Sequence, residues 1–163
     1  MNHARYTRLV DAIQTQRLQT VQDALAELRA VAKTFQPHYQ VGENPSEFDL
    51  DWTLTNARSE EDLTPMAVLC HLYAMMKTKG DVASCDRLNA IAEWLIAHGA
   101  DPFLDQARPL FADGRRGTGA SIVQTFGRAN LPSAVQAAIN AVNDSTGEDA
   151  RVLRYWLRLG IAA

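Results

Sequence analysis

The sequence predicts an all-α protein made of stacked helical hairpins. Apolar residues recur at intervals of three and four along most of the chain, which is the spacing of an amphipathic helix. No segment alternates apolar and polar residues for long enough to predict a strand. The chain has 163 residues, of which 47% are hydrophobic, and this is enough for one continuous core. We therefore expect residues 1–163 to form a single helical domain.

The first two helices are predicted from two apolar stripes that a polar stretch, residues 14–17, separates. Because the gap is short, the two helices should pair as an antiparallel hairpin. The first stripe consists of Tyr6, Leu9, Val10 and Ile13, and the second of Leu18, Val21, Leu25, Leu28 and Val31.

The segment Met66–Met76 is apolar on nearly all sides and predicts a central helix that is buried on more than one face. Thr64 and Pro65 precede it. A Thr hydroxyl can cap a free backbone N–H group, and Pro is favoured at the first helical position. We therefore expect the helix to begin at Pro65 with a Thr64 cap.

Three further helices complete the prediction. A stripe over 88–96 is followed by Gly99, which suits a left-handed C-terminal cap, and a last helix over 149–159 is followed by Gly160 in the same way. Between them, an apolar stripe over 135–142 begins just after Ser133. Ser133 and Gln136 have the spacing of a capping box.

Two stretches lack helical periodicity. Residues 36–63 are predicted to be a long irregular insertion, rich in carboxylates and aromatic rings. Residues 113–119 are basic and glycine-rich, and they predict a flexible turn that leads into a short helix with Ile122, Val123 and Phe126.

The block 62–69, Asp-Leu-Thr-Pro-Met-Ala-Val-Leu, and the later block 94–102, Trp-Leu-Ile-Ala-His-Gly-Ala-Asp-Pro, together resemble an ankyrin repeat. In that family a Thr-Pro-Leu-His turn opens the first helix and Gly-Ala-Asp follows the second. The resemblance implies a short ankyrin-like solenoid, with residues 9–25 as an N-terminal cap and the helices near 133–142 and 149–159 as a C-terminal cap. It also implies that Arg108-Pro109-Leu110-Phe111 is a degenerate opening of a third unit.

The sequence departs from the family pattern at two points. Ala67 and Phe111 stand where the family has its His, so the hydrogen bonds of that side chain are absent. Thr64 to Gly99 spans 35 residues, against ~21 in the family pattern. The extra residues should lengthen the two helices and the turn between them, around Lys77–Ser84.

Composition narrows the functional classes without excluding nucleic-acid binding. The formal net charge of −3 supplies no general attraction to nucleic acid or to anionic lipid, so we favour neither partner. No apolar run reaches the ~20 residues of a membrane span, and the N-terminal residues lack the apolar core of a signal peptide. We expect a cytoplasmic protein.

The residues that could carry chemistry are better explained as structural. Cys70 and His71 are neighbours, but adjacent helical residues do not face each other, so we expect Cys70 to be a buried packing residue. The two Cys and four His are scattered along the chain, and we predict no metal site and no cofactor. The stretch 114–121 lacks the Gly-Lys-Ser/Thr sequence of a nucleotide-binding loop.

These observations favour a non-enzymatic module that binds, and inhibits, another protein, as a bacterial immunity protein neutralises a toxin. The ankyrin resemblance implies protein binding, because repeat stacks present extended rigid surfaces. Within the acidic segment 43–62 we select Glu47, Phe48, Asp49, Asp51 and Trp52 as partner-binding residues, with a basic patch expected on the partner, and we add Arg115 and Arg116 from the glycine-rich turn. Two alternatives stay open: a small enzyme that uses Cys70 or the Arg115 loop, and a nucleic-acid-binding helical domain.

Overall fold

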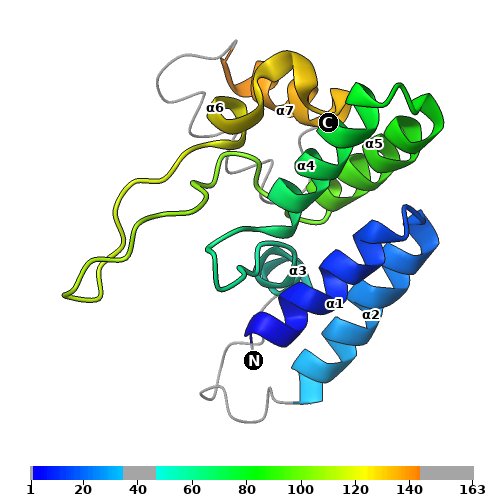
Figure 1. Ribbon diagram of the computed structural model, residues 1–163. Coiled ribbons are helices and arrows are strands. Elements are labelled where there is room, and N and C mark those ends of the chain that lie inside the picture. Colours follow the sequence, from blue (N-terminus) through cyan, green and yellow to red (C-terminus); the bar gives the residue numbers. More distant parts are fainter. Residues whose placement is uncertain (1, 35–46, 144–163) are drawn as a thin grey trace.

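The computed structural model describes residues 2–34 and 47–143, and the regular secondary structure of these residues is helical (Figure 1). The elements are α1 (Asn2–Gln14), α2 (Leu18–Thr34), α3 (Glu47–Thr55), α4 (Pro65–Thr78), α5 (Val82–Ala97), α6 (Ile122–Phe126), the 3-10 helix η2 (Arg128–Asn130) and α7 (Ser133–Asn143). Extended pairing in this part of the chain is limited to two isolated antiparallel bridges. The all-α prediction is therefore confirmed for the described residues.

The helices pack in two rows. Helices α1 and α2 form one hairpin, α4 and α5 form a second, and the hairpins lie against each other through α1 with α4 and α2 with α5 (Figure 1). Helices α6 and α7 continue the rows by packing on α4 and α5 respectively, while α3 packs against α1 and α2. Among the described helices, none combines the length and apolar character needed to cross a membrane.

One apolar core runs through the whole described structure. The predicted stripes supply most of it: Leu9, Ile13, Val21, Leu25, Leu88, Ile91, Leu95, Val135 and Ile139 are all at most 3% exposed. Val31, at the far end of the second stripe, differs and is 53% exposed. The stripes were thus assigned to the correct face, except at the end of α2.

Helix α4 begins at Pro65, as predicted, but its start is not capped as expected. The Thr64 hydroxyl is buried and finds no hydrogen-bond partner in the described structure. The Thr64 N–H instead donates to the Gln106 side chain, at 2.8 Å. Only the first half of the helix is buried, because His71 and Met75 are exposed. The turn that follows consists only of residues 79–81. The residues by which Thr64 to Gly99 exceeds the ankyrin pattern therefore lie in α4 and α5 and not in the turn between them.

The capping box predicted at Ser133 is wrong. The Ser133 hydroxyl donates to the Asn89 side-chain oxygen on α5 at 2.9 Å, and the Ala134 N–H donates to the same oxygen at 3.0 Å. Gln136 donates to the Leu131 carbonyl. A neighbouring helix therefore caps α7. A capping box does form at the start of α6, between Ser121 and Gln124.

Gly99 follows α5 with a φ of 95°, which confirms the predicted left-handed residue at that end. A Cβ atom there would lie 3.0 Å from the Trp52 Cα atom, so the glycine also permits close contact with α3. Gly160 and the helix predicted over 149–159 lie outside the described residues.

The irregular insertion predicted over 36–63 is wrong in part, because residues 47–55 form α3. Residues 36–46 lie outside the described part. The predicted opening of a third unit at residues 108–111 is also wrong. These residues belong to an extended hairpin, and the next helix begins only at Ile122. That short helix itself is confirmed.

Candidate functional site

Residues 105–120, named here the finger, leave the stack between α5 and α6 and project away from the helices (Figure 1). Hydrogen bonds join its two arms. Gln106 and Ala120 exchange N–H to carbonyl bonds of 2.8 and 3.2 Å, and the Gly117 N–H donates to the Pro109 carbonyl at 2.8 Å. The finger is therefore a paired hairpin and not the flexible turn that its composition predicts.

Two glycines allow the arms of the finger to approach each other. A Cβ atom on Gly119 would lie 2.2 Å from the Gln106 carbonyl oxygen, and one on Gly117 would lie 2.8 Å from the Pro109 side chain. Gly114, with a φ of 82°, forms the end turn, where its N–H donates to the Phe111 carbonyl. The glycine content thus serves hairpin geometry.

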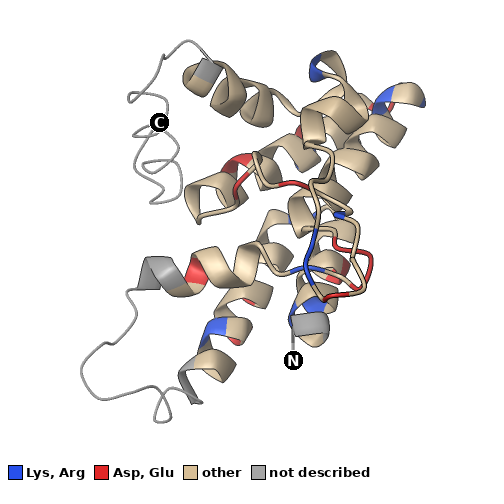
Figure 2. Ribbon diagram, turned by 90° about the vertical axis from the view of Figure 1, so that its left-hand side faces the viewer, with Lys and Arg blue, Asp and Glu red and all other residues tan. Residues whose placement is uncertain are grey.

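Asp62 anchors the base of the finger. Its carboxylate accepts hydrogen bonds from the Arg108 N–H and Nε, both at 2.9 Å, and from Arg108 Nη2 at 3.0 Å. Arg58 lies 3.3 Å away as a second cation. These bonds, with a smaller contribution from the Arg58 charge, lower the pKa of the buried Asp62 carboxyl to about 2. Figure 2 shows basic and acidic segments alternating where the finger meets the underlying loop.

Two further side chains hold the base. Arg58 Nη1 donates to the Asp105 carbonyl at 2.6 Å and to the Asp62 carbonyl at 3.1 Å. The buried Gln106 side chain accepts from the Thr64 N–H and donates to the Leu104 carbonyl at 3.0 Å. The finger is therefore fixed to the segment that precedes α4, which favours a rigid projection over a mobile loop.

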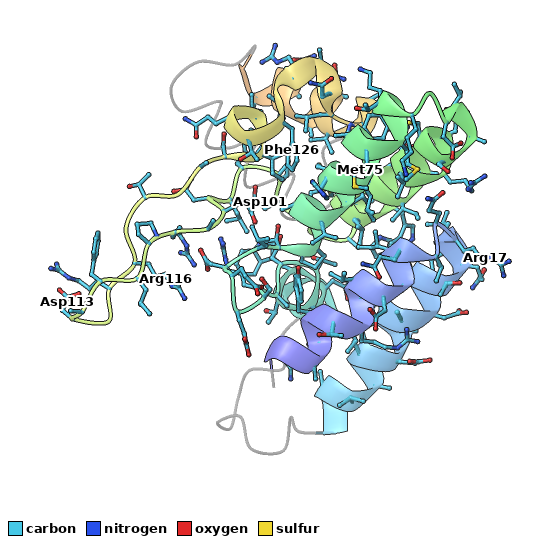
Figure 3. All side chains as sticks on the ribbon, in the orientation of Figure 1. Arg17, Met75, Asp101, Asp113, Arg116 and Phe126 are labelled. Carbon is cyan, nitrogen blue, oxygen red and sulfur yellow. The ribbon has the colours of Figure 1, made fainter. Side chains whose placement is uncertain are left out.

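The outer part of the finger exposes apolar and cationic side chains together. Leu110 is 63% exposed and Phe111 is 53% exposed. Arg115 Nε lies 2.6 Å from Asp113 Oδ2 in a solvent-exposed ion pair. Arg116 Nη1 donates to the Arg108 carbonyl at 2.9 Å. Asp113 and Arg116 both project from the finger, well away from the helices (Figure 3). We name Leu110, Phe111, Arg115 and Arg116 the fingertip.

The structure changes the role of the acidic segment. Asp51 is 5% exposed and forms a two-bond ion pair with Arg29 on α2, so the expectation that it is an exposed binding charge is wrong. Trp52 is half-buried and its backbone contacts Gly99. Glu47, Phe48 and Asp49 lie on α3, but their side chains are outside the described part.

Asn56, just after α3, was missed by sequence reasoning. Its amide group donates to the carbonyls of Trp52 and Gly99, each at 2.8 Å, and its side-chain oxygen accepts from the Asp101 N–H at 2.9 Å. It therefore joins α3 to the segment from which the finger emerges. Two of its partners, Gly99 and Asp101, are more than 40 positions away in sequence, and a single Asn at a helix end carries no local sign of such contacts.

Of the two catalytic candidates, the Arg115 loop is part of the finger, whereas Cys70 lies on α4. Cys70 is fully buried, and this burial raises the pKa of its thiol to about 12, so the thiol stays protonated at neutral pH. His71 is exposed, and its ring lies 6.3 Å from the Phe126 ring. Within residues 2–34 and 47–143, no three His, Cys, Asp or Glu side chains gather closely enough to hold a metal ion.

Comparison of the chain with protein-family models, with curated proteins and with solved structures found no match. The features of the described residues that bear on function are the finger and the helices that carry it.

Proposed function

We propose that this protein is a non-enzymatic protein-binding module whose fingertip docks into another protein. The observation that carries the proposal is the exposure of Leu110 and Phe111 on a hairpin whose base is fixed by Asp62 and Gln106. A large apolar side chain in water is common singly, but two neighbours beside two Arg side chains have the composition of an interface centre. A fixed base lowers the entropy lost on binding.

We further propose that the helical pairs are atypical, ankyrin-like repeats. The two rows of helices, the Thr64-Pro65 start of α4 and the Gly99 cap after α5 support this proposal. A short stack of this kind suits a protein that blocks a partner, and a bacterial immunity protein that neutralises a toxin is the most concrete example.

The fingertip also defines the chemistry of the partner site. Its two Arg side chains call for carboxylates around an apolar recess in the partner, because Arg pairs best with planar carboxylates. The acidic segment 43–62 predicts a basic patch on the partner. This prediction loses support, since Asp51 and Asp62 are buried and paired with Arg29 and Arg108. The buried, protonated Cys70 thiol likewise supports a packing role for that residue.

The test compares the partners captured by three forms of the protein from an extract of its native host. These are the wild type, the fingertip variant Leu110→Ser/Phe111→Ser, and the control Val31→Ser, which changes an exposed apolar residue on α2. We expect the wild type and the control to retain the same protein and the fingertip variant to lose it. Surface plasmon resonance on the purified partner should then show faster dissociation of the fingertip variant. Equal capture and equal rates for all three forms would overturn the proposal.

A further inference from the structure

The end of the stack that lies opposite the finger carries a second set of exposed side chains. The turns α1–α2 and α4–α5 lie on the same side of the molecule, away from the finger (Figure 1). Contacts link them into one edge, because Arg87 Nη2 donates to the Gln16 side chain at 3.1 Å and Lys77 donates to the Ala129 carbonyl in η2. We define the turn edge as residues 15–17, 77–87 and 128–130. Arg17 lies on this side in Figure 3.

The turn edge is basic although the chain as a whole carries a charge of −3. It holds five cationic side chains, Arg17, Lys77, Lys79, Arg87 and Arg128, all exposed, and only two carboxylates, Asp81 and Asp86. Asp81 is occupied as the cap of α5, where it accepts from the Ser84 N–H and hydroxyl. Among the described residues, none of the five cations forms an ion pair, although Lys79 and Arg87 lie near enough to Asp81 to help lower the pKa of its carboxyl. Five cations against two carboxylates leave the turn edge with a net positive charge of three.

Two apolar side chains are exposed at or beside the turn edge. Val82, the first residue of α5, is 68% exposed, and Met75, one turn before the end of α4, is 39% exposed. Phosphate groups of a nucleic acid would pair with the cations but would leave Val82 in water. The described turn edge also has no aromatic side chain on which a base could stack. A protein surface that offers both carboxylates and aliphatic side chains would pair with the cations and also cover Val82.

We infer that the turn edge is a second docking surface, which accepts an acidic amphipathic segment of a protein. Carboxylates of that segment pair with Arg17, Lys79 and Arg128, and its aliphatic side chains cover Val82. This surface is separate from the fingertip and does not depend on the function proposed for the fingertip.

The probe is a fluorescein-labelled 18-residue helical peptide with Glu and Leu on one face and Ala elsewhere, and binding is followed by fluorescence anisotropy. Two variants reverse the same number of charges: Arg17→Glu/Lys79→Glu at the turn edge and, as the control, Arg5→Glu/Arg8→Glu on α1, outside both the turn edge and the fingertip. The Arg17 and Lys79 side chains are exposed and form no ion pair in the described structure, so the turn-edge variant should stay folded and lose at most about 1 kcal/mol, from the charge reversed at the end of α4. We expect the turn-edge variant to bind the peptide at least about tenfold more weakly than the wild type, while the α1 control binds as the wild type does.

Val82→Ser tests the apolar part of the inference and should weaken binding of the peptide several-fold. A matching peptide with Lys in place of Glu should not bind. Equal affinities of the wild type and the turn-edge variant would overturn the inference. So would tighter binding of a 20-base-pair DNA duplex, or of phosphatidylserine vesicles, together with no effect of Val82→Ser. Leu110→Ser/Phe111→Ser, the variant used for partner capture, is measured alongside and reports any peptide binding that belongs to the fingertip. Loss of partner capture by that variant and loss of peptide binding by the turn-edge variant are therefore independent results.

Discussion

Asp62 joins the segment before α4 to the finger through both its carboxyl group and its backbone carbonyl. Its carboxyl group and its carbonyl bind Arg108, Arg58 and the Ala107 N–H, and its φ of 61° is unusual for a residue other than Gly. The folded state lowers the pKa of Asp62 from 3.8 to about 2. A carboxyl whose pKa is lowered by folding stabilises the protein above its unfolded pKa, and this contribution disappears as the pH falls through the folded pKa.

Replacing Asp62 with Asn should therefore destabilise the protein by about 2 to 3 kcal/mol at pH 7, because two guanidinium groups lose their anion. The difference from the wild type should fall by about half at pH 3 and disappear below pH 2. Urea unfolding at several pH values measures it. Asp113→Asn removes an exposed ion pair and is the matched control, with an expected cost near zero. A difference that does not change between pH 7 and pH 3 would contradict this assignment.

Sequence reasoning could not place the buried charges. Asp51 and Asp62 stand in an acidic segment, and a run of carboxylates normally predicts a solvated surface. Their partners are 22 and 46 residues away, on α2 and in the finger. The residues that flank Asp51 and Asp62 in the sequence contain no information about ion pairs with partners so distant in the chain. By contrast, the burial of Cys70 was predicted correctly, because it depends only on the apolar character of its own helix.

At the level of elements, the helices with a clear stripe were predicted and α3 was not. Phe48, Leu50, Trp52 and Leu54 occupy every second position, so the segment has no single apolar face. It is nevertheless helical because it packs against both α1 and α2, and Asn56 joins its end to Gly99. Surroundings of this kind override local periodicity.

The same contrast holds for helix ends. The cap at Gly99 was predicted, because a left-handed residue is a local backbone requirement. The cap at Ser133 was not, because Asn89 on a neighbouring helix supplies the acceptor. Local rules thus locate the ends of these helices but not the source of every cap.

Gly80 and Gly99 both have a positive φ, but only Gly99 lies against a neighbouring helix. Substitution of each by Ala therefore distinguishes the cost of backbone strain from the cost of a packing clash. Gly99→Ala should destabilise the protein by about 2 kcal/mol or more, since it adds a clash with the Trp52 backbone to the cost of the left-handed conformation. Gly80→Ala meets nothing within 4 Å and should cost only about 1 kcal/mol. Chemical denaturation of both variants measures the difference. Equal losses would show that the α3 contact with Gly99 does not constrain the fold.

The finger should open when its arms are forced apart. Gly119→Ala places a Cβ atom on the Gln106 carbonyl, so the hydrogen bonds between Gln106 and Ala120 should break. Hydrogen exchange of these two amides should become at least tenfold faster, which corresponds to about 1.4 kcal/mol, while the amides of α5 keep their protection. Gly114→Ala, at the end turn, meets no neighbouring atom and adds only the cost of a left-handed residue, about 1 kcal/mol, so as a control for strain in the hairpin it should speed this exchange less. Unchanged exchange in Gly119→Ala would mean that the hairpin pairing is not formed in solution.

For the whole molecule, the fingertip and the turn edge place apolar and cationic side chains at opposite ends of the same helices (Figure 3). Sequence order hides this arrangement. The turn edge collects residues from 15–17, 77–87 and 128–130, which become neighbours only when the hairpins stack. Between the two ends, the core is continuous from α1 to α7.

That continuity predicts a single unfolding transition. Ile13 in α1 and Ile139 in α7 lie at the two ends of the core and are 0% and 3% exposed. Ile→Val at either position removes one buried methylene and should cost about 1 kcal/mol. If the pairs unfolded separately, each variant would shift only part of the transition. We expect both to shift the whole urea transition, with far-UV circular dichroism and tryptophan fluorescence coincident in each. Val82→Ala, at an exposed site, should shift neither signal. Two separated transitions in either variant would show that the stack unfolds in parts and that its core is not one cooperative unit.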